Sequence, residues 1–222
     1  LANEESFAAE VKRMSDTIQE KFGKRPTVFR NSSLIYNDEI GAQVAAMGFK
    51  GMITEGAKQI LGWKSPHYIY NCASDPRLKL LLRDISLSED ITERFTSNPL
   101  MADQWLDWIA STPEGENVIN IFGELVTFGI FHPLQGGILE FLKAIPALAK
   151  ERGIGFALPS ELCEENSVGS IEVPYSISWV DEERDTSCWL GNAMQREAFN
   201  KLYSIADRVR VSGDRRIQMD WD

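Results

Sequence analysis

Apolar residues spaced three or four positions apart predict helices in several parts of the chain. Phe7, Val11, Met14 and Ile18 follow this spacing, which predicts an amphipathic helix over residues 6–22 that ends at Gly23. Similar patterns predict helices from about Asp38 to Met47, over 88–96 and 99–110, over 134–150 with a kink or break at Pro146, and from about Asn192 to Arg210.

Short apolar runs between these helices predict strands. The runs are rich in β-branched, aromatic and leucine residues, and they cover residues 27–31, 49–54, 78–82, 118–122 and 154–158, with 67–72 as a short strand or an extended loop. The runs are continuous rather than alternating, which is typical of a parallel sheet covered on both faces. The order of the elements therefore predicts an α/β fold. About five clear strands are too few to close an eight-stranded barrel, so the sheet is open or the chain is part of something larger.

The net charge indicates which partners the chain can bind, and the cysteine content indicates its compartment. Acidic residues outnumber basic ones by 33 to 23, which gives a net charge of −10. This charge repels phosphate backbones and anionic lipid, so we expect neither nucleic acid nor membrane as a partner. The three cysteines are widely spaced and odd in number, which favours a reducing compartment such as the cytoplasm. The chain begins at Leu1, so the lack of a visible signal peptide carries little weight.

Candidate chemistry gathers where the predicted strands end. In parallel α/β folds the reactive residues follow the carboxyl ends of strands, and this rule selects Arg30, Asn31, Ser33, Glu55 and Glu124. Carboxylates and aromatic side chains such as Trp63 and Phe128 in one opening suit sugar recognition. The same residues also have structural interpretations: an ion pair for Arg30, a core position for Trp63 and a solvated strand end for Glu124.

Other motifs are missing from the sequence. It contains no Gly-rich phosphate loop and no Gly-x-Ser-x-Gly nucleophile elbow. The two histidines, His67 and His132, lie 65 positions apart with no close Cys or His partner. We therefore expect neither a metal site nor a cofactor.

Two segments resemble signature regions of the α-amylase branch of glycoside hydrolase family 57. Residues 28–36 read VFRNSSLIY and are similar to the pattern VFRNTELIY, while residues 118–129 contain IFGELVTFG, similar to LFMDYETFG. Stretches at 48–66, 137–142 and 191–203 also resemble the family. Its opening His-Gln-Pro signature is absent, which indicates a fragment.

This resemblance implies a fold and a domain division. The family has a (β/α)7 barrel, so residues 1–163 are expected to form part of such a barrel. Residues 164–222 are expected to form an irregular segment and a C-terminal helical region packed on it. The implied ligand is an α-glucan, and no oligomeric state follows.

The resemblance also implies site roles. Ser33 stands at the position of the family's nucleophile Glu, and Glu124 stands at the position of its acid/base Asp. Arg30, Asn31, Glu55, Trp63 and Phe128 are the candidate substrate-binding residues. Retaining glycosidases need two carboxyl groups about 5–5.5 Å apart. A neutral hydroxyl with no neighbouring base is a poor replacement for one of them, so Ser33 is the serious departure.

Three functional hypotheses follow. The first is a protein that binds α-1,4-glucan and has lost most hydrolysis because Ser33 replaces the nucleophile. The second is an active amylase or glucanotransferase that uses Glu124 as acid/base and a relocated carboxylate or water as its partner. The third is a non-catalytic structural or protein-interaction domain.

Overall fold

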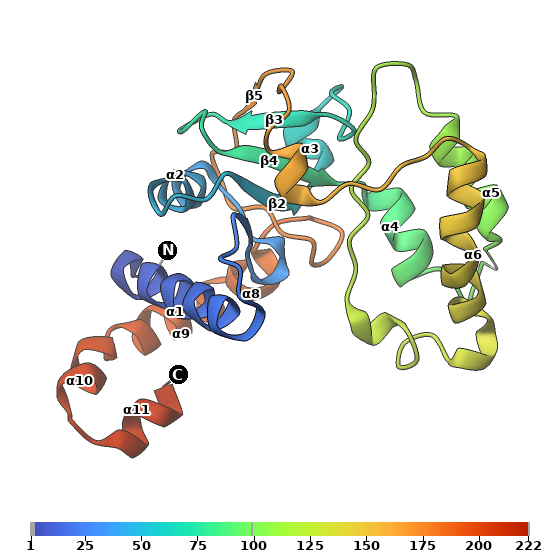
Figure 1. Ribbon diagram of the computed structural model, residues 1–222. Helices are drawn as coiled ribbons and strands as arrows, with labels where there is room; N and C mark the ends of the chain where they lie inside the picture. The colour runs from blue at the N-terminus through green and yellow to red at the C-terminus, as the bar shows by residue number, and fades with distance from the viewer. Residues whose placement is uncertain (1–2, 99, 222) are drawn as a thin grey trace.

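A computed structural model describes residues 3–98 and 100–221 of the chain. It contains a five-stranded sheet with helices on its faces and flanks (Figure 1). The strands are β1 (Val28–Arg30), β2 (Gly51–Glu55), β3 (Ile69–Cys72), β4 (Lys79–Arg83) and β5 (Ser170–Ile171). The longer helices are α1 (Glu4–Phe22), α2 (Asp38–Ala46), α4 (Ile85–Thr92), α5 (Ala102–Ala110), α6 (Ile138–Glu151) and α9 (Ala193–Tyr203).

Shorter helical turns connect these elements. They are α3 (Lys58–Leu61), α7 (Pro159–Leu162), α8 (Ser187–Leu190), α10 (Ala206–Val211) and α11 (Arg215–Trp221), with 3-10 turns η1 (Ser32–Leu34), η2 (Leu125–Thr127) and η3 (Leu134–Gly136). None of the helices in the described residues is long and apolar enough to span a membrane.

The strand order is β1-β2-β4-β3-β5, and most neighbouring pairs are parallel. This arrangement confirms the predicted α/β fold class. Strand β3 is the exception, because it pairs antiparallel with β4 through the register Ile69–Leu81. Parallel β1, β2 and β4 end on the same side of the sheet, so the segments that follow them meet there.

Local sequence signals explain several helix boundaries. Asn3 caps α1 by accepting a hydrogen bond from the Ser6 N–H, and Gly23 ends the helix with a left-handed φ of 72°. Asn37 caps α2 through the Ile40 N–H. The predicted helix over 6–22 is thereby confirmed, with its start two residues earlier.

Two hydrophobic clusters hold the fold together. The larger one fills the space between the sheet and α2 and includes Tyr36, Val44, Met52, Leu80 and Ile171. The second lies beside the sheet, where α5 and α6 pack against each other and against the end of α4 (Figure 1). Helix α4 follows β4 directly, so the second cluster fixes the helix that borders the carboxyl end of the sheet.

Two of the predicted strands are wrong. Residues 118–122 make a single parallel bridge, from Asn120 to Arg83, and residues 154–158 are extended without pairing to a described strand. Phe156 and Leu158 are exposed. Residues 154–158 have the apolar composition that predicts a buried strand, but none of the described strands pairs with them.

Some helix predictions also need correction. Helix α6 runs through Pro146 without a break, and it begins at Ile138 rather than 134. The last predicted helix divides into α9 and α10 near Ser204. The predicted helix over 99–110 begins at Ala102 in the structure, and its first residue lies outside the described residues.

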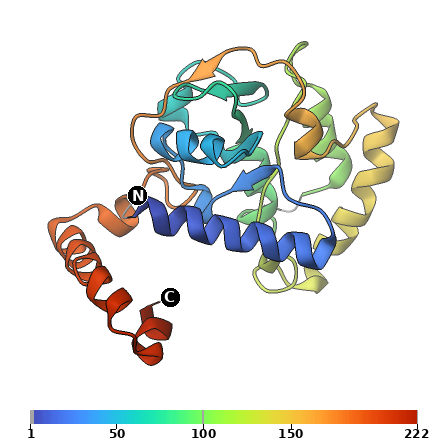
Figure 2. The same cartoon turned by 60° about the vertical axis from the view of Figure 1, so that its left-hand side comes forward.

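The C-terminal helices α9, α10 and α11 extend away from the sheet (Figures 1 and 2). Helix α9 joins the body through α8, where Gln195 Nε2 donates to the Cys188 carbonyl and Arg196 Nη1 to the Leu190 carbonyl. Asn3 and Ser6, near the start of α1, line a hollow together with Val209 and Trp221. Residues 170–177, in contrast, join the sheet through β5 and a bridge between Ile177 and Tyr36. The division between residues 1–163 and 164–222 remains a prediction.

Candidate functional site

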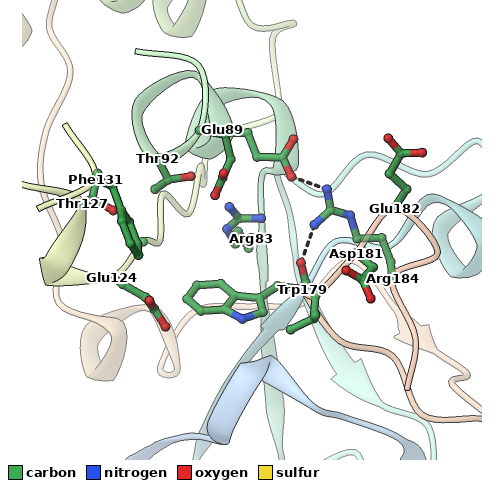
Figure 3. Close-up of a pocket in the computed structure, with 13 residues that line it drawn as sticks. Arg83, Glu89, Thr92, Glu124, Thr127, Phe131, Trp179, Asp181, Glu182 and Arg184 are labelled. Atoms are coloured by element: carbon green, nitrogen blue, oxygen red, sulfur yellow. Dashed lines mark hydrogen bonds and ion pairs between the residues drawn. The ribbon is translucent and has the colours of Figure 1, made fainter. Parts of the chain in front are cut away.

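A cavity of about 490 Å³ opens beside the carboxyl end of β4. It lies between α4, the segment 123–131 and the segment 179–184 (Figure 3). Its lining combines charged and aromatic side chains. These are Arg83, Glu89, Thr92, Glu93, Glu124, Thr127, Phe131, Trp179, Asp181, Glu182 and Arg184, together with Gly123 and Val180.

A buried ion pair lies under the cavity. Arg83, the last residue of β4, donates from Nη1 to Glu55 Oε2 at 2.9 Å and from Nε to the Phe122 carbonyl at 2.8 Å. Glu55 ends the neighbouring strand β2, and its other oxygen accepts the Gly56 N–H at 2.9 Å. The Glu55 side chain is 0% exposed. Burial raises the pKa of the Glu55 carboxyl, although Arg83 opposes this.

A second arginine ties the segment 179–184 to α4. Arg184 forms an ion pair with Glu89 of α4, lies 3.8 Å from Glu55 Oε2, and donates a hydrogen bond to the Trp179 carbonyl. Both cations of the cavity lining are therefore bound to carboxylates of the protein. The network sets the position of Trp179 and of the loop that follows it.

Trp179 forms part of the cavity wall beside these cations. The Arg83 guanidinium lies 5.5 Å from the centroid of its ring and the Arg30 guanidinium 5.9 Å from it. Phe122 packs against the same indole with ring centroids 5.4 Å apart. Arg30 lies 5.1 Å from the Phe122 ring, so it makes cation–π contacts with both aromatic groups.

The segment carrying Ser33 is held against the segment carrying Trp179. The Ser33 carbonyl accepts hydrogen bonds from the Trp179 N–H at 3.1 Å and from Ser178 Oγ at 3.0 Å. Ser33 itself is half-buried. Its position is thus next to the cavity wall, although it is not one of the residues that line the cavity.

Backbone strain is concentrated at this junction. Among the described residues, the non-glycine positions with a left-handed φ are Ser33 (50°), Leu34 (52°), Asp181 (58°) and Arg184 (53°). Such conformations persist only where the surrounding structure enforces them, and they cluster at functional sites. All four belong to the two segments that meet at the Ser33 carbonyl.

Glu124 is exposed and lines the cavity opposite Asp181 in the view of Figure 3. The preceding residue allows this approach, because a Cβ on Gly123 would lie 2.4 Å from the Thr92 methyl group of α4. The family pattern has a larger residue at position 123. A glycine here lets the chain pass close to α4 before Glu124 enters the cavity.

The structure separates the other candidate residues. Arg30 reaches the wall through its cation–π contacts, whereas Glu55 lies beneath the cavity with no exposed surface. Asn31 bonds to the backbone of Ser32 and Ile35. Trp63 is 93% exposed and does not line the cavity, and Phe128 packs against the α5–α6 cluster. Glu124 is the one of the seven candidates that lines the cavity; the roles assigned to all seven remain predictions.

Several lining residues did not emerge from the sequence. Arg83 directly follows the apolar run 78–82, so the rule about strand ends could have selected it. Trp179, Asp181 and Arg184 lie in a stretch with no regular pattern, and their approach to the sheet depends on contacts far along the chain.

His67 connects the start of α4 to the segment that precedes Glu124 through two carboxylates, Asp84 and Glu116. His67 Nε2 lies 2.7 Å from Asp84 Oδ2, and His67 Nδ1 lies 2.9 Å from Glu116 Oε2. The hydrogen bond to Asp84, aided by the one to Glu116, raises the pKa of His67. Burial opposes ionisation of Asp84, but the His67 hydrogen bond is among the interactions that lower its pKa. Asp84 also caps α4 through the Leu87 N–H.

The chemistry available in the cavity is therefore asymmetric. Glu124 places an exposed carboxyl group on one side of the cavity, and Asp181 and Glu182 place theirs on the other. Ser33, next to the cavity wall, carries a hydroxyl, and the strand-end carboxylate of Glu55 is buried in its ion pair. The aromatic groups Trp179 and Phe131 supply apolar surface next to these polar groups.

Comparison with known proteins gives one family and one fold. The sequence profile of glycosyl hydrolase family 57 matches residues 1–178. A putative alpha-amylase from Methanocaldococcus jannaschii is 41% identical over 221 residues, which cover 96% of this chain and 46% of that protein. The chain thus spans about half the length of this curated relative.

Two solved structures share the fold. The 4-alpha-glucanotransferase from Thermococcus litoralis matches with a TM-score of 0.64 and 15% identity, over 93% of this chain and 32% of that one. An exo-type maltose-forming amylase from Pyrococcus sp. ST04 matches with a TM-score of 0.63 and 16% identity, over 85% of this chain and 36% of that one. These likenesses confirm the predicted fold class, with the sheet as an incomplete barrel.

Proposed function

The chain belongs to glycosyl hydrolase family 57, and we propose that its cavity binds α-1,4-glucan while hydrolysis by the retaining route is lost or very slow. The relatives support the ligand class, since they are described as an alpha-amylase, a 4-alpha-glucanotransferase and a maltose-forming amylase. A cavity that combines aromatic and carboxylate side chains is suited to a sugar. A cytoplasmic location is part of the proposal and rests on the three free cysteines.

The proposed loss of hydrolysis is supported by the sequence resemblance, in which Ser33 takes the position of the family's nucleophile Glu. In the retaining route, one carboxylate forms an ester with the anomeric carbon while the other protonates the leaving oxygen. Glu124 can supply the proton. A serine hydroxyl next to no base can neither form that ester nor offset the positive charge of the transition state.

Glu55 is poorly placed to replace the missing carboxylate. One of its oxygens accepts the Gly56 N–H and the other accepts from Arg83, and no part of the side chain reaches the cavity surface. An attack on a sugar would require both interactions to break and Arg83 to move.

A second candidate function is a working α-glucan enzyme. It is favoured by three further carboxylates at the cavity, Glu93, Asp181 and Glu182. One of them could activate a water molecule while Glu124 acts as the acid. Such an enzyme would show turnover in the unmodified protein.

The decisive experiment combines binding and turnover. Calorimetric titration with maltohexaose measures affinity, and release of reducing ends over days measures hydrolysis. We expect binding with negligible hydrolysis, and we expect Ser33→Glu to raise hydrolysis at least about a hundredfold, which is about 2.7 kcal/mol of barrier. The matched control is Ser32→Glu, which adds the same charge at the exposed neighbouring position.

The outcomes separate the two candidates. Ready turnover by the unmodified chain that disappears in Glu124→Gln would favour the working enzyme and contradict the proposed loss. Absence of binding to any maltooligosaccharide would remove the glucan proposal itself.

A further inference from the structure

The charges at the cavity are not balanced. Two arginines line it, Arg83 and Arg184, against five acidic residues: Glu89, Glu93, Glu124, Asp181 and Glu182. The positive charges are also engaged. Arg83 is paired with Glu55 beneath the floor, and Arg184 is paired with Glu89 of the wall. Each arginine of the lining is thus offset by a carboxylate of the protein, and Glu89 also pairs with Arg94.

Four carboxylates remain around the opening. Glu93, Glu124, Asp181 and Glu182 are all exposed, and within the described part of the chain none of them has a Lys, Arg or His partner within 4 Å. They do not form a group suited to a metal ion either, as far as the described residues extend. Their negative charge therefore faces whatever enters the cavity.

The backbone holds two of these carboxylates in place. Asp181 has a left-handed φ of 58°, and Arg184, which ends the segment containing Asp181 and Glu182, has a left-handed φ of 53°. Arg184 fixes that end to α4 through Glu89, and Trp179 fixes the other end to the Ser33 carbonyl. Figure 3 shows this loop along one side of the cavity with Glu124 on the other. A charged ligand thus meets carboxylates from both sides.

We propose that the cavity selects glycans by charge, with Asp181 and Glu182 as specificity-determining residues. It accepts uncharged or amine-bearing α-glucans and rejects phosphorylated ones. The inference rests on the proposed function, because it takes the same cavity as the glucan site. Its physical basis is that a phosphate ester would bring up to two negative charges among four carboxylates that have no Lys, Arg or His partner within 4 Å in the described part of the chain. An ammonium group at the same position would instead be attracted.

The test compares three ligands of equal length. They are maltohexaose, maltohexaose with one 6-phosphate, and maltohexaose in which one 6-hydroxyl is replaced by an amino group. At 20 mM salt and pH 7 we expect the phosphate to weaken binding at least about tenfold relative to maltohexaose, and the amine to strengthen it severalfold. Both differences should shrink at 0.5 M salt, because exposed charges are screened over distances of about 10 Å or less at and above 0.1 M.

Paired variants assign the effect to the loop. In Asp181→Asn/Glu182→Gln we expect the ratio of phosphate to neutral affinity to rise several-fold towards one. The control Glu165→Gln/Glu172→Gln makes the same change in net charge at exposed positions away from the cavity, and it should leave the ratio unchanged. The salt dependence of the unmodified protein gives an independent readout if the loop variant does not fold.

Each outcome of the binding measurements either supports or contradicts the proposed selection by charge. Equal affinity for the three ligands at low salt, or discrimination that is as strong in the loop variant as in the unmodified protein, would overturn the inference and leave the proposed function intact. Failure of all three to bind would refute the proposed function and this inference together.

Discussion

Replacement of His67 tests whether its two carboxylate contacts stabilise the fold. The change His67→Gln keeps a polar side chain of similar length but removes the ionisable ring. His67 is 15% exposed, and its nitrogens lie 2.7 Å from Asp84 and 2.9 Å from Glu116. Hydrogen bonds that involve charged groups contribute about 1.5–3 kcal/mol each. Since burial of the ring opposes part of this, we expect the variant to lose about 2–3 kcal/mol of unfolding free energy at pH 6.

The effect should depend on pH in a defined direction. The pKa of His67 is raised in the folded protein. A raised histidine pKa means that the stabilisation is complete below the ordinary value near 6.5 and is lost as the pH rises through the folded-state pKa. The difference between the unmodified protein and His67→Gln should therefore be largest at pH 6 and smallest near pH 9.

Two measurements check this reasoning. Urea unfolding followed by tryptophan fluorescence gives the free-energy difference at each pH, and an NMR titration of the two histidines gives the midpoint for His67. Glu116→Gln should lower that midpoint. Glu114→Gln, an exposed change of the same charge two residues away, should not. A free-energy difference that is the same from pH 6 to pH 9 would refute the assignment of a charged His67.

Three further predictions concern the residues beneath and beside the cavity and the cap of helix α2. Arg83→Met should lower the unfolding free energy by about 3–5 kcal/mol at pH 8 in urea unfolding, because it removes the nearer cation from the buried Glu55 carboxylate and leaves only Arg184 at 3.8 Å. The loss should be smaller at pH 5, since the raised pKa of Glu55 lets a proton neutralise it. Gly123→Ala should cost about 1–3 kcal/mol through its clash with the Thr92 methyl group, and thermal unfolding should show that Thr92→Ser restores most of the loss. Asn37→Ala should cost about 1 kcal/mol by removing the cap of α2, whereas Asn37→Ser should retain most of it in the same assay.

These three would fail in different ways. A pH-independent effect of Arg83→Met would argue against proton uptake by Glu55. Failure of Thr92→Ser to restore the Gly123→Ala variant would mean that the cost has a cause other than the clash between the new Cβ and the Thr92 methyl group. Equal losses in both Asn37 variants would show that the hydroxyl of serine cannot replace the amide as a cap.

Local patterns in the sequence predict the helices and the strands that have partners nearby. Helix α1 and strands β1 and β2 follow from apolar spacing and β-branched composition, although in α1 Val11 is buried while Met14 and Phe22 of the same apolar pattern are exposed. Residues 154–158 have the same kind of composition but no partner among the described residues, so composition alone gives the wrong answer. The antiparallel direction of β3 is equally hidden, since apolar runs do not encode the direction of pairing.

The residues of the candidate site differ in the same way in how well the sequence predicts them. Glu124 and the neighbourhood of Ser33 can be found from short motifs, because the family resemblance is carried by contiguous residues. The loop containing Trp179, Asp181 and Arg184 cannot, because it has no periodic pattern and its place is set by bonds to Ser33 and Glu89. Burial of Glu55 is likewise a property of the assembled sheet and not of its sequence neighbours.

The pair of hydrogen bonds on the Ser33 carbonyl has a consequence for biosynthesis. The Ser178 hydroxyl that reaches this carbonyl lies 145 residues further along the chain. At a translation rate of about 5–20 residues per second, the ribosome adds Ser178 roughly 7–30 s after it adds Ser33. Until then neither hydrogen bond to the Ser33 carbonyl can form, so the cavity wall that Trp179 provides is completed only after this later segment has been made.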